Sequence, residues 1–479
     1  MTAAAAVLPP VRRIGRGTML AYAFGAVAYG VKDSGFGAFL LLFYNQVVGL
    51  PSATVGLVIM LALVIDAVID PGVGFFSDRT RSRWGRRHPW MYAAALPIAI
   101  GWVLLWHPPQ GWSETSVLVW LFAMAVLVRS AVSCYEVPSV ALTAELTADY
   151  DERTRIMAYR YLFGWMGGLA MLVSAYGYFL AKSPEFPNGL LNRDGYAAFG
   201  ITGAVLMALA ILVSAGGTHH EIKRLPHPPT RNGSLKESFG ELRATVRNRG
   251  FALLMLAGVC AYTNQGIAYA LSNYLYAYVW KFSGAVLAMV PLVLFGGVFI
   301  AFLIAPRVAR RLGKPRAATG FVLGAAVFNT APYWLRLGDL LPEGIGLLAV
   351  LLVLFMTATA FGVSGFIVGA SMMADVVEDS EARTGLRSEG VFFAGSFFVQ
   401  KCTSGLGIFL AGTILAIAGF PEQAQPGTVP DATIDRLTLI FITLYLTLAT
   451  IAAVLFSRFP FGRAEHEARL ARMGDTFTR

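Results

Sequence analysis

The chain has 479 residues, of which 56% are hydrophobic and only 14% are charged, and its mean hydropathy is +0.61. Soluble domains carry about 25% charged residues, so this composition excludes a soluble globular protein and indicates a polytopic membrane protein. The net charge of +10 does not require a nucleic-acid partner, because Lys and Arg in loops act as topology signals. Three cysteines lie in apolar stretches without metal-ligand spacing, which argues against redox chemistry.

Hydrophobic runs long enough to cross a bilayer, about 20 residues each, occur in two groups of six. They fall near residues 18–42, 52–76, 89–107, 116–141, 156–181 and 196–215, and near 250–280, 284–306, 316–336, 344–373, 389–418 and 434–457. The sequence therefore predicts an all-α polytopic membrane protein of twelve transmembrane helices. We expect an N-terminal six-helix bundle (1–215), a cytoplasmic linker loop (216–249), a C-terminal six-helix bundle (250–458) and a cytoplasmic tail (459–479).

Lys and Arg are distributed unequally between the two sides of these spans. With the N-terminus taken as cytoplasmic, 29 of them lie in loops and tails on that side and five on the other. Positively charged loops stay in the cytoplasm, so both termini are expected there. The N-terminus has neither the residue order of a cleaved signal peptide nor a lipidation motif, and we expect the first span to direct insertion into a bacterial inner membrane.

Two aspartates lie within the second span. Asp66 and Asp70 are four residues apart, so on a helix they share one face, with side chains about 6 Å apart. Two unsolvated negative charges at that distance repel each other, so a bound cation, a proton or a basic side chain from another helix is expected between them. A pair kept only for packing is the weaker alternative, because ionisable residues inside a membrane are usually functional.

A dense basic loop follows this span. Five arginines within nine residues, from Arg79 to Arg87, are too hydrophilic to cross lipid, which predicts a cytoplasmic loop. A nucleic-acid or anionic-lipid patch is the less favoured interpretation. We expect the loop to lock the closed cytoplasmic side by pairing with acidic residues at helix ends of the other half. The candidate gating residues are Asp78, Arg79, Arg83, Arg86, Asp375 and Glu378.

Eight charged residues remain well inside the spans, four of each sign. They are Lys32, Arg129, Arg160 and Lys401, and Asp33, Asp66, Asp70 and Glu136. Near balance is expected of a polar cavity, because an unpaired charge in low dielectric costs several kcal/mol. Arg129, Ser133 and Glu136 recur at i, i+4 and i+7 and so share a helix face. This face predicts a substrate or ion site, or else an internal bridge between Arg129 and Glu136.

The two groups of spans show a weak repeat. The loop after span 2 (SDRTRSRWGRRHPW) has a basic counterpart after span 8 (APRVARRLGKPRA). Parallel repeats of six spans are the layout of the major facilitator superfamily, with substrate bound near the midplane between the halves. A channel would instead need rings of like charge. An enzyme would need a nucleophile and a base, and no histidine lies in the interior of the spans to serve as one.

Several motifs together resemble one family of this superfamily. They are Lys32-Asp33, VVGLPSATVG before span 2, Asp66-Ala67-x-x-Asp70-Pro71, TRSRWG-x-x-x-PW, Glu136-Val137-Pro138 followed by ALTAEL, MMADVVED and Gln400-Lys401. The pattern is similar to that of the glycoside-pentoside-hexuronide:cation symporters and runs through most of the chain. The resemblance implies a major facilitator fold of two six-helix bundles and symport of a solute with a cation.

The resemblance also implies roles for single residues. Asp66, Asp70 and Ser133 match positions that bind the coupling cation, so Na⁺ at Asp66 and Asp70 is one expectation. The residues expected to bind substrate are Lys32, Asp33, Arg129, Glu136, Arg160 and Lys401. Of these, Arg129 is proposed from its helix face, and the other five from the motif. Lys401 matches a lysine near both sites.

Departures from the family pattern leave the substrate and the cation open. Ile69 stands where the family has a cation-binding asparagine, which leaves H⁺ or Na⁺ as the coupling ion. Val132 and Val140 stand where aromatic residues are expected, so an amphipathic or anionic solute such as a lysophospholipid is the alternative to a sugar or glycoside. We expect a cation-coupled symporter working by alternating access, without enzymatic activity or cofactor. Its expected partners are a small-molecule substrate and membrane lipid, with no nucleic acid, and the protein is expected to be a monomer.

Overall fold

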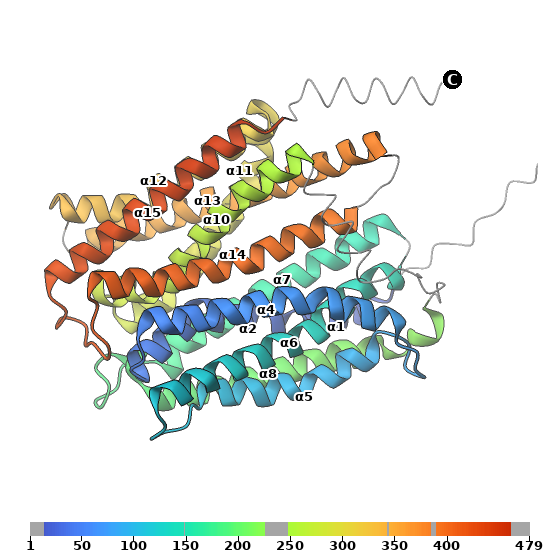
Figure 1. The fold of residues 1–479 in the computed structure, drawn as a ribbon, viewed down its shortest axis with the longest axis horizontal. Coiled ribbons are helices and arrows are strands. Elements are labelled where there is room, and N and C mark those ends of the chain that lie inside the picture. Colours follow the sequence, from blue (N-terminus) through green and yellow to red (C-terminus); the bar gives the residue numbers. More distant parts are fainter. Residues whose placement is uncertain (1–13, 148, 226–247, 343, 385–388, 461–479) are drawn as a thin grey trace, which may run out of the picture. The chain divides into compact units, whose positions relative to one another are not determined.

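The computed structural model describes residues 14–147, 149–225, 248–342, 344–384 and 389–460. These residues form helices and no strand, and the helices follow one another as labelled in Figure 1. The helices are α1 (Arg16–Phe24), α2 (Val27–Ser34), α3 (Leu40–Leu42), α4 (Ser52–Arg79), α5 (His88–Trp106), α6 (Glu114–Leu146), α7 (Tyr150–Ser174), α8 (Arg193–His219), α10 (Arg249–Tyr274), α11 (Gly284–Leu312), α12 (Lys314–Leu337), α13 (Ile345–Thr384), α14 (Glu389–Ala418) and α15 (Asp431–Ser457). Most of the expected linker and tail lie outside the described residues.

These helices group into twelve long runs that match the twelve predicted spans. In the first run a turn at residues 25–26 joins α1 to α2, the π-helical segment Gly35–Phe39 joins α2 to α3, and a second π-helical segment, Phe43–Val47, follows α3. Two others end in π-helical segments, Ala175–Phe179 after α7 and Leu275–Val279 after α10. Eleven of the runs are long and apolar enough to cross a membrane. The remaining helix, α12, has the length, but its interior is less apolar because it carries Asn329, Thr330 and Pro332.

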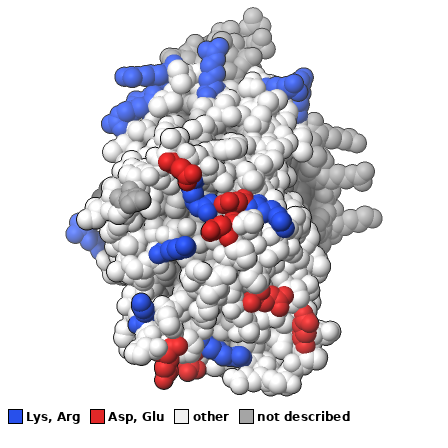
Figure 2. Space-filling model, turned by 90° about the vertical axis from the view of Figure 1, so that its left-hand side faces the viewer, with Lys and Arg blue, Asp and Glu red and all other residues white. Residues whose placement is uncertain are grey.

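Charged side chains are sparse on the surface drawn in Figure 2, most of which consists of uncharged residues. This agrees with the composition of a chain that is 14% charged. The all-helical architecture and the number of runs confirm the predicted fold class. The length of each hydrophobic run predicts a helix, because a segment that crosses lipid must satisfy its own backbone hydrogen bonds.

The chain folds into two compact units. The first comprises Met1–Gly35, Val68–Met171 and Tyr196–Asn232, and the second comprises Phe36–Ala67, Leu172–Gly195 and Gly233–Arg479. The second half of α4 therefore belongs to the first unit and its first half to the second unit. The division into two six-helix bundles at 216–249 stays a prediction.

In the first unit, α5 packs along α6, and α8 lies beside them (Figure 1). Trp102 and Trp106 of α5 are fully buried, and the Trp106 ring stacks on Tyr196 of α8 with centroids 5.7 Å apart. Gly200 allows this approach, because a Cβ there would lie 2.8 Å from Cβ of Trp106. Large aromatic rings fitted against small residues hold α5 and α8 together.

In the second unit, α10 contacts α14 and α15, while α13 contacts α11 and α12. The α10–α14 contact is made backbone to backbone. A Cβ on Gly407 of α14 would lie 2.4 Å from the Thr263 carbonyl oxygen of α10. Small residues at such crossings let membrane helices pack closely. The first half of α4 packs on α14 in the same way, where the Ser52 hydroxyl donates to the Gly412 carbonyl at 2.9 Å.

Candidate functional site

The first predicted pair of charges lies on α2. The Lys32 ammonium is 3.8 Å from the Asp33 carboxylate, and the two side chains differ sharply in exposure, at 5% and 55%. The helix is held against α7 by glycines, because a Cβ on Gly30 would lie 1.9 Å from the Gly164 carbonyl oxygen. The backbone of α2 is therefore fixed by α7, and Asp33 remains open on another face.

The acidic residue of α6 pairs with an arginine of α7. The Arg160 guanidinium donates to Glu136 at 3.0 Å and to the Ser139 hydroxyl at 2.7 Å, and it also lies over the Tyr22 ring at 4.9 Å. The second carboxylate oxygen of Glu136 is buried and accepts no hydrogen bond from the described residues. Glu136 thus has one oxygen occupied by Arg160 and one available to a donor.

The two other residues predicted on the same face of α6 are also placed inside the first unit. Arg129 and Ser133 are both buried, and α6 continues through Pro138 without a break. Arg129 and Glu136 both interact electrostatically with Tyr29 of α2. The structure therefore brings together Asp33, Arg129 and Glu136 around one part of α2. Their predicted contact with a substrate stays a prediction.

In the second unit, Asp66 of α4 forms an ion pair with Lys401 of α14. The Lys401 ammonium is 3.0 Å from the carboxylate, with side-chain exposures of 24% for Lys401 and 3% for Asp66. Of the three positive groups expected beside Asp66, the structure thus provides the basic side chain from another helix. Asp70 follows one turn later on α4 and interacts electrostatically with Cys134.

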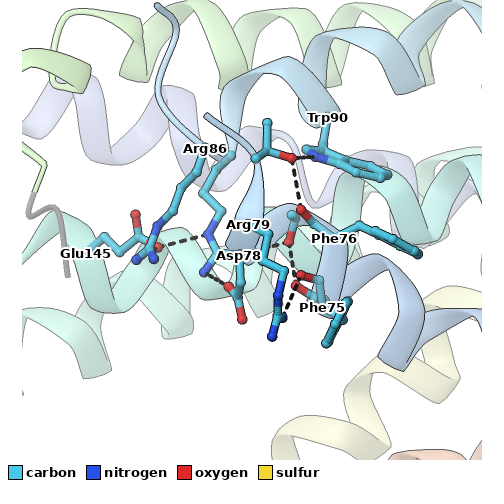
Figure 3. A network of polar contacts seen from close by, with 11 residues as sticks. Phe75, Phe76, Asp78, Arg79, Arg86, Trp90 and Glu145 are labelled. Carbon is cyan, nitrogen blue, oxygen red and sulfur yellow. Dashed lines mark hydrogen bonds and ion pairs between the residues drawn. The ribbon is translucent and has the colours of Figure 1, made fainter. Parts of the chain in front are cut away.

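The basic loop after α4 is held by a network within the first unit (Figure 3). Glu145 accepts from Arg86 at 2.8 Å and from Arg87 at 2.9 Å, and Arg87 also pairs with Asp78. Arg79 folds back on its own helix and lies over the Phe75 ring at 3.5 Å. The network therefore fixes the loop to the end of α6, because one carboxylate binds two successive arginines.

Sequence reasoning did not name Arg87 and Glu145 as site residues. In the sequence Arg87 is one of a run of five arginines, and Glu145 lies within the ALTAEL motif. The signal in the sequence for Glu145 is its place just after the fourth apolar span, on the same side as the basic loop. Arg83 has a different contact, because its guanidinium lies over the Trp84 ring at 5.4 Å.

The predicted acidic gating residues lie at the end of α13 in the second unit. Asp375 pairs with Lys314 of α12 at 2.5 Å, Asp379 accepts from Asn248 at 3.3 Å, and Glu378 is exposed. The expected pairing of these residues with the basic loop stays a prediction. Across the described residues, no three His, Cys, Asp or Glu side chains are grouped to hold a metal ion, and Na⁺ at Asp66 and Asp70 also stays a prediction.

Long apolar helices with buried, paired charges in their interior define an integral membrane transporter. The chain belongs to the MFS/sugar transport protein family, which matches residues 21–463. This confirms the resemblance to the glycoside-pentoside-hexuronide symporters. Transporters of this family are not enzymes.

Three bacterial relatives match most of the chain. It is 28% identical to a putative 2,3-dihydroxypropane-1-sulfonate exporter of Salmonella typhimurium, over 84% of this chain and 86% of the relative. It is 25% identical to the inner membrane symporter YicJ of Escherichia coli, over 91% of each. It is also 25% identical to the isoprimeverose transporter of Lactiplantibacillus pentosus, over 83% of this chain and 80% of the relative.

The fold is shared with solved transporters. The crystal structure of a D-xylose-proton symporter superimposes with a TM-score of 0.61 at 15% identity, covering 92% of this chain and 97% of that one. At this level of identity the likeness concerns the fold alone. It confirms the predicted major facilitator fold.

Proposed function

We propose that the protein is a cation-coupled symporter of a sugar or glycoside-like solute, driven by H⁺ or Na⁺ through alternating access. The observation that carries the proposal is the buried ion pair between Asp66 and Lys401, one helical turn from Asp70. Asp70 adds a second carboxylate one turn along the same helix, and a carboxylate that takes up one further positive charge is what coupling requires. The names of YicJ, a symporter, and of the isoprimeverose transporter support the class of activity.

The polar groups of the first unit suit a polyhydroxylated solute. Asp33 is open, and a buried oxygen of Glu136 accepts no hydrogen bond from the described residues. Both can accept hydrogen bonds from hydroxyl groups. A buried acceptor left unsatisfied costs about 1–3 kcal/mol, so a hydroxyl that reaches Glu136 gains affinity. A solute without hydroxyl or N–H groups has no hydrogen bond to donate to either carboxylate.

Coupling follows if the cation and the solute together favour a state that neither favours alone. A cation bound at Asp66 and Asp70 would neutralise the carboxylates and weaken the hold of Asp66 on Lys401. We propose the bacterial inner membrane as the location, with both termini in the cytoplasm. The name of YicJ and the excess of Lys and Arg on one side support this placement.

The test uses purified protein in proteoliposomes with a panel of methyl and 4-nitrophenyl pyranosides, under an inward gradient of either Na⁺ or H⁺. We expect at least one glycoside to accumulate against its gradient, and Asp70→Asn to abolish accumulation while exchange of bound solute persists. Asp435→Asn is the matched control, because Asp435 also pairs with a basic residue, Arg336, but its side chain is 43% exposed. Full accumulation of the glycoside by Asp70→Asn would contradict the assignment of Asp70 to the cation site.

The choice of substrate class is tested by binding alone. Tryptophan fluorescence of the wild-type protein is titrated with the pyranosides and with lysophosphatidylcholine, in Na⁺ at pH 8 and without Na⁺ at pH 6. A pyranoside response that Na⁺ strengthens supports sodium-coupled sugar symport despite Ile69. A lysolipid response without any pyranoside response would overturn the sugar assignment.

A further inference from the structure

The first transmembrane run has one open face, and an aromatic residue lies on it. From residue 21 to residue 50, all of which are described, every side chain is buried or partly buried except two. These are Tyr29, at 41% exposure, and Asp33, whose side chain is 55% exposed. They are four residues apart and therefore share one face of α2.

The open face of α2 carries a carboxylate that is more than half exposed. A carboxylate within a membrane span lines a water-filled cavity or pairs with other polar groups, because exposure to lipid is costly. Asp33 pairs with Lys32 and is still more than half open, which favours a hydrated face. Tyr29 lies one turn before Asp33 on that face, and its 41% exposure shows that the ring is not within the packed interior.

Charged groups surround Tyr29. The Lys32 ammonium lies 4.2 Å from the centroid of the Tyr29 ring and 3.8 Å from the Asp33 carboxylate, so Lys32 joins the ring to the carboxylate. Asp33, Glu136 and Arg129 interact electrostatically with Tyr29, as does Tyr161 of α7. The ring remains 41% exposed despite these neighbours. Its position is therefore fixed by contacts, and part of its surface stays accessible.

We infer that Tyr29 is a substrate-contacting residue that selects solutes with a pyranose ring. The aromatic ring would pack against the apolar C–H face of a sugar, while the hydroxyl groups at the sugar's edge reach Asp33 and Glu136. Ligand sites commonly combine an aromatic surface with a few placed polar groups. This inference rests on the proposed function and adds a preference for cyclic sugars over open-chain polyols of the same polarity.

The carboxylates alone do not provide that preference. A hydroxyl group on a flexible chain reaches an acceptor as well as one on a ring, apart from the rotamer freedom lost on binding. A flat aromatic surface adds contact area only for a solute with a flat apolar face. The ratio of the two affinities therefore reports on Tyr29, whereas absolute affinity reports on the whole site.

The experiment measures binding of a methyl pyranoside and of the corresponding alditol, such as methyl β-D-xylopyranoside and xylitol, to full-length protein in detergent. The pyranoside chosen for this comparison is the member of the panel that binds the wild type most tightly. We expect the wild type to prefer the pyranoside, and Tyr29→Leu to lose about fivefold to tenfold in pyranoside affinity with little change for the alditol. Tyr29→Phe keeps the aromatic ring and is expected to stay within about twofold of the wild type.

Tyr178→Leu is the matched control, since Tyr178 is 78% exposed and lies in the π-helical segment after α7. Should Tyr29→Leu fail to give monodisperse protein, Tyr29→Trp replaces it. That variant is expected to keep the preference for the ring and to add a solute-dependent tryptophan signal, and an unchanged signal refutes the inference.

If the wild type binds pyranosides and Tyr29→Leu binds them equally well, Tyr29 has no such role while the proposed function stands. If the wild type binds no pyranoside, both fail.

Discussion

Replacing Lys401 by methionine is the most informative change that the structure offers. Methionine keeps most of the volume of the side chain but removes the ammonium that lies 3.0 Å from Asp66. Asp66 is 3% exposed, so its carboxylate cannot be solvated in place of the lost partner. The variant therefore removes the ammonium that pairs with a buried carboxylate of the second unit.

The expected cost follows from the geometry. Two unit charges 3.0 Å apart attract each other by about 5 kcal/mol at an effective dielectric constant of about 20. The 24% exposure of Lys401 lowers this value, and removing one partner of a buried pair costs about 3–5 kcal/mol. We expect Lys401→Met to lower the free energy of unfolding by about 3 kcal/mol. The double variant Asp66→Asn/Lys401→Met is expected to regain most of this loss, because neither member of the pair is then charged.

The assay is reversible unfolding in mixed detergent micelles. The free energy of unfolding is compared for the wild type, Lys401→Met, Asp66→Asn and the double variant. Lys314→Met is the control, because Lys314 also binds a carboxylate of the second unit but is 34% exposed. Its loss is expected to cost only about 1 kcal/mol. The reasoning is refuted if Lys401→Met is as stable as the wild type, or if the double variant is no more stable than Lys401→Met.

Two other predictions concern the first unit. Glu145→Gln removes the carboxylate shared by Arg86 and Arg87, and we expect trypsin to cut the loop at Arg86 at least several times faster than in the wild type; an unchanged cleavage rate would contradict the network. Gly30→Ala places a Cβ 1.9 Å from a backbone oxygen of α7, so overpacking is expected to cost about 1–3 kcal/mol of unfolding free energy. Gly72→Ala has no atom within 4 Å of the new Cβ and should be neutral, so equal stability of the two variants would show that α2 does not approach α7 closely.

The helices could be predicted from the sequence because lipid imposes one simple requirement. Each span had to be apolar and about 20 residues long, and all twelve predicted runs are helical in the structure. The requirement on Asp66 was equally local. A buried carboxylate needs a positive group, and the structure provides Lys401, which the resemblance had placed near both sites. In these cases the energetic constraint lies in the residue itself and does not depend on the details of packing.

The partners of residues were harder to predict than their presence. Helical periodicity placed Arg129 and Glu136 on one face of a helix and left an internal bridge open, whereas Glu136 forms its ion pair with Arg160 of another helix. Periodicity describes one helix at a time, so it cannot predict which side chains of other helices contact that face. Tyr29 shows the same limit, because an aromatic residue in an apolar span looks like a packing contact. Only the arrangement of α2, α6 and α7 reveals that its face is open.

Each unit carries its own counter-ions, and this bears on how coupling could work. In the first unit Glu136 is held by Arg160, and in the second Asp66 is held by Lys401. A cation arriving at Asp66 under the proposed function must compete with Lys401, so its net binding energy is the difference between two ion contacts and not the whole of one. Such an exchange keeps the affinity for the cation moderate. Release of Lys401 from Asp66 then depends on cation binding. If Lys401→Met raises the affinity for the coupling cation while abolishing its effect on solute binding, the exchange is supported; lowered cation affinity in that variant would refute it.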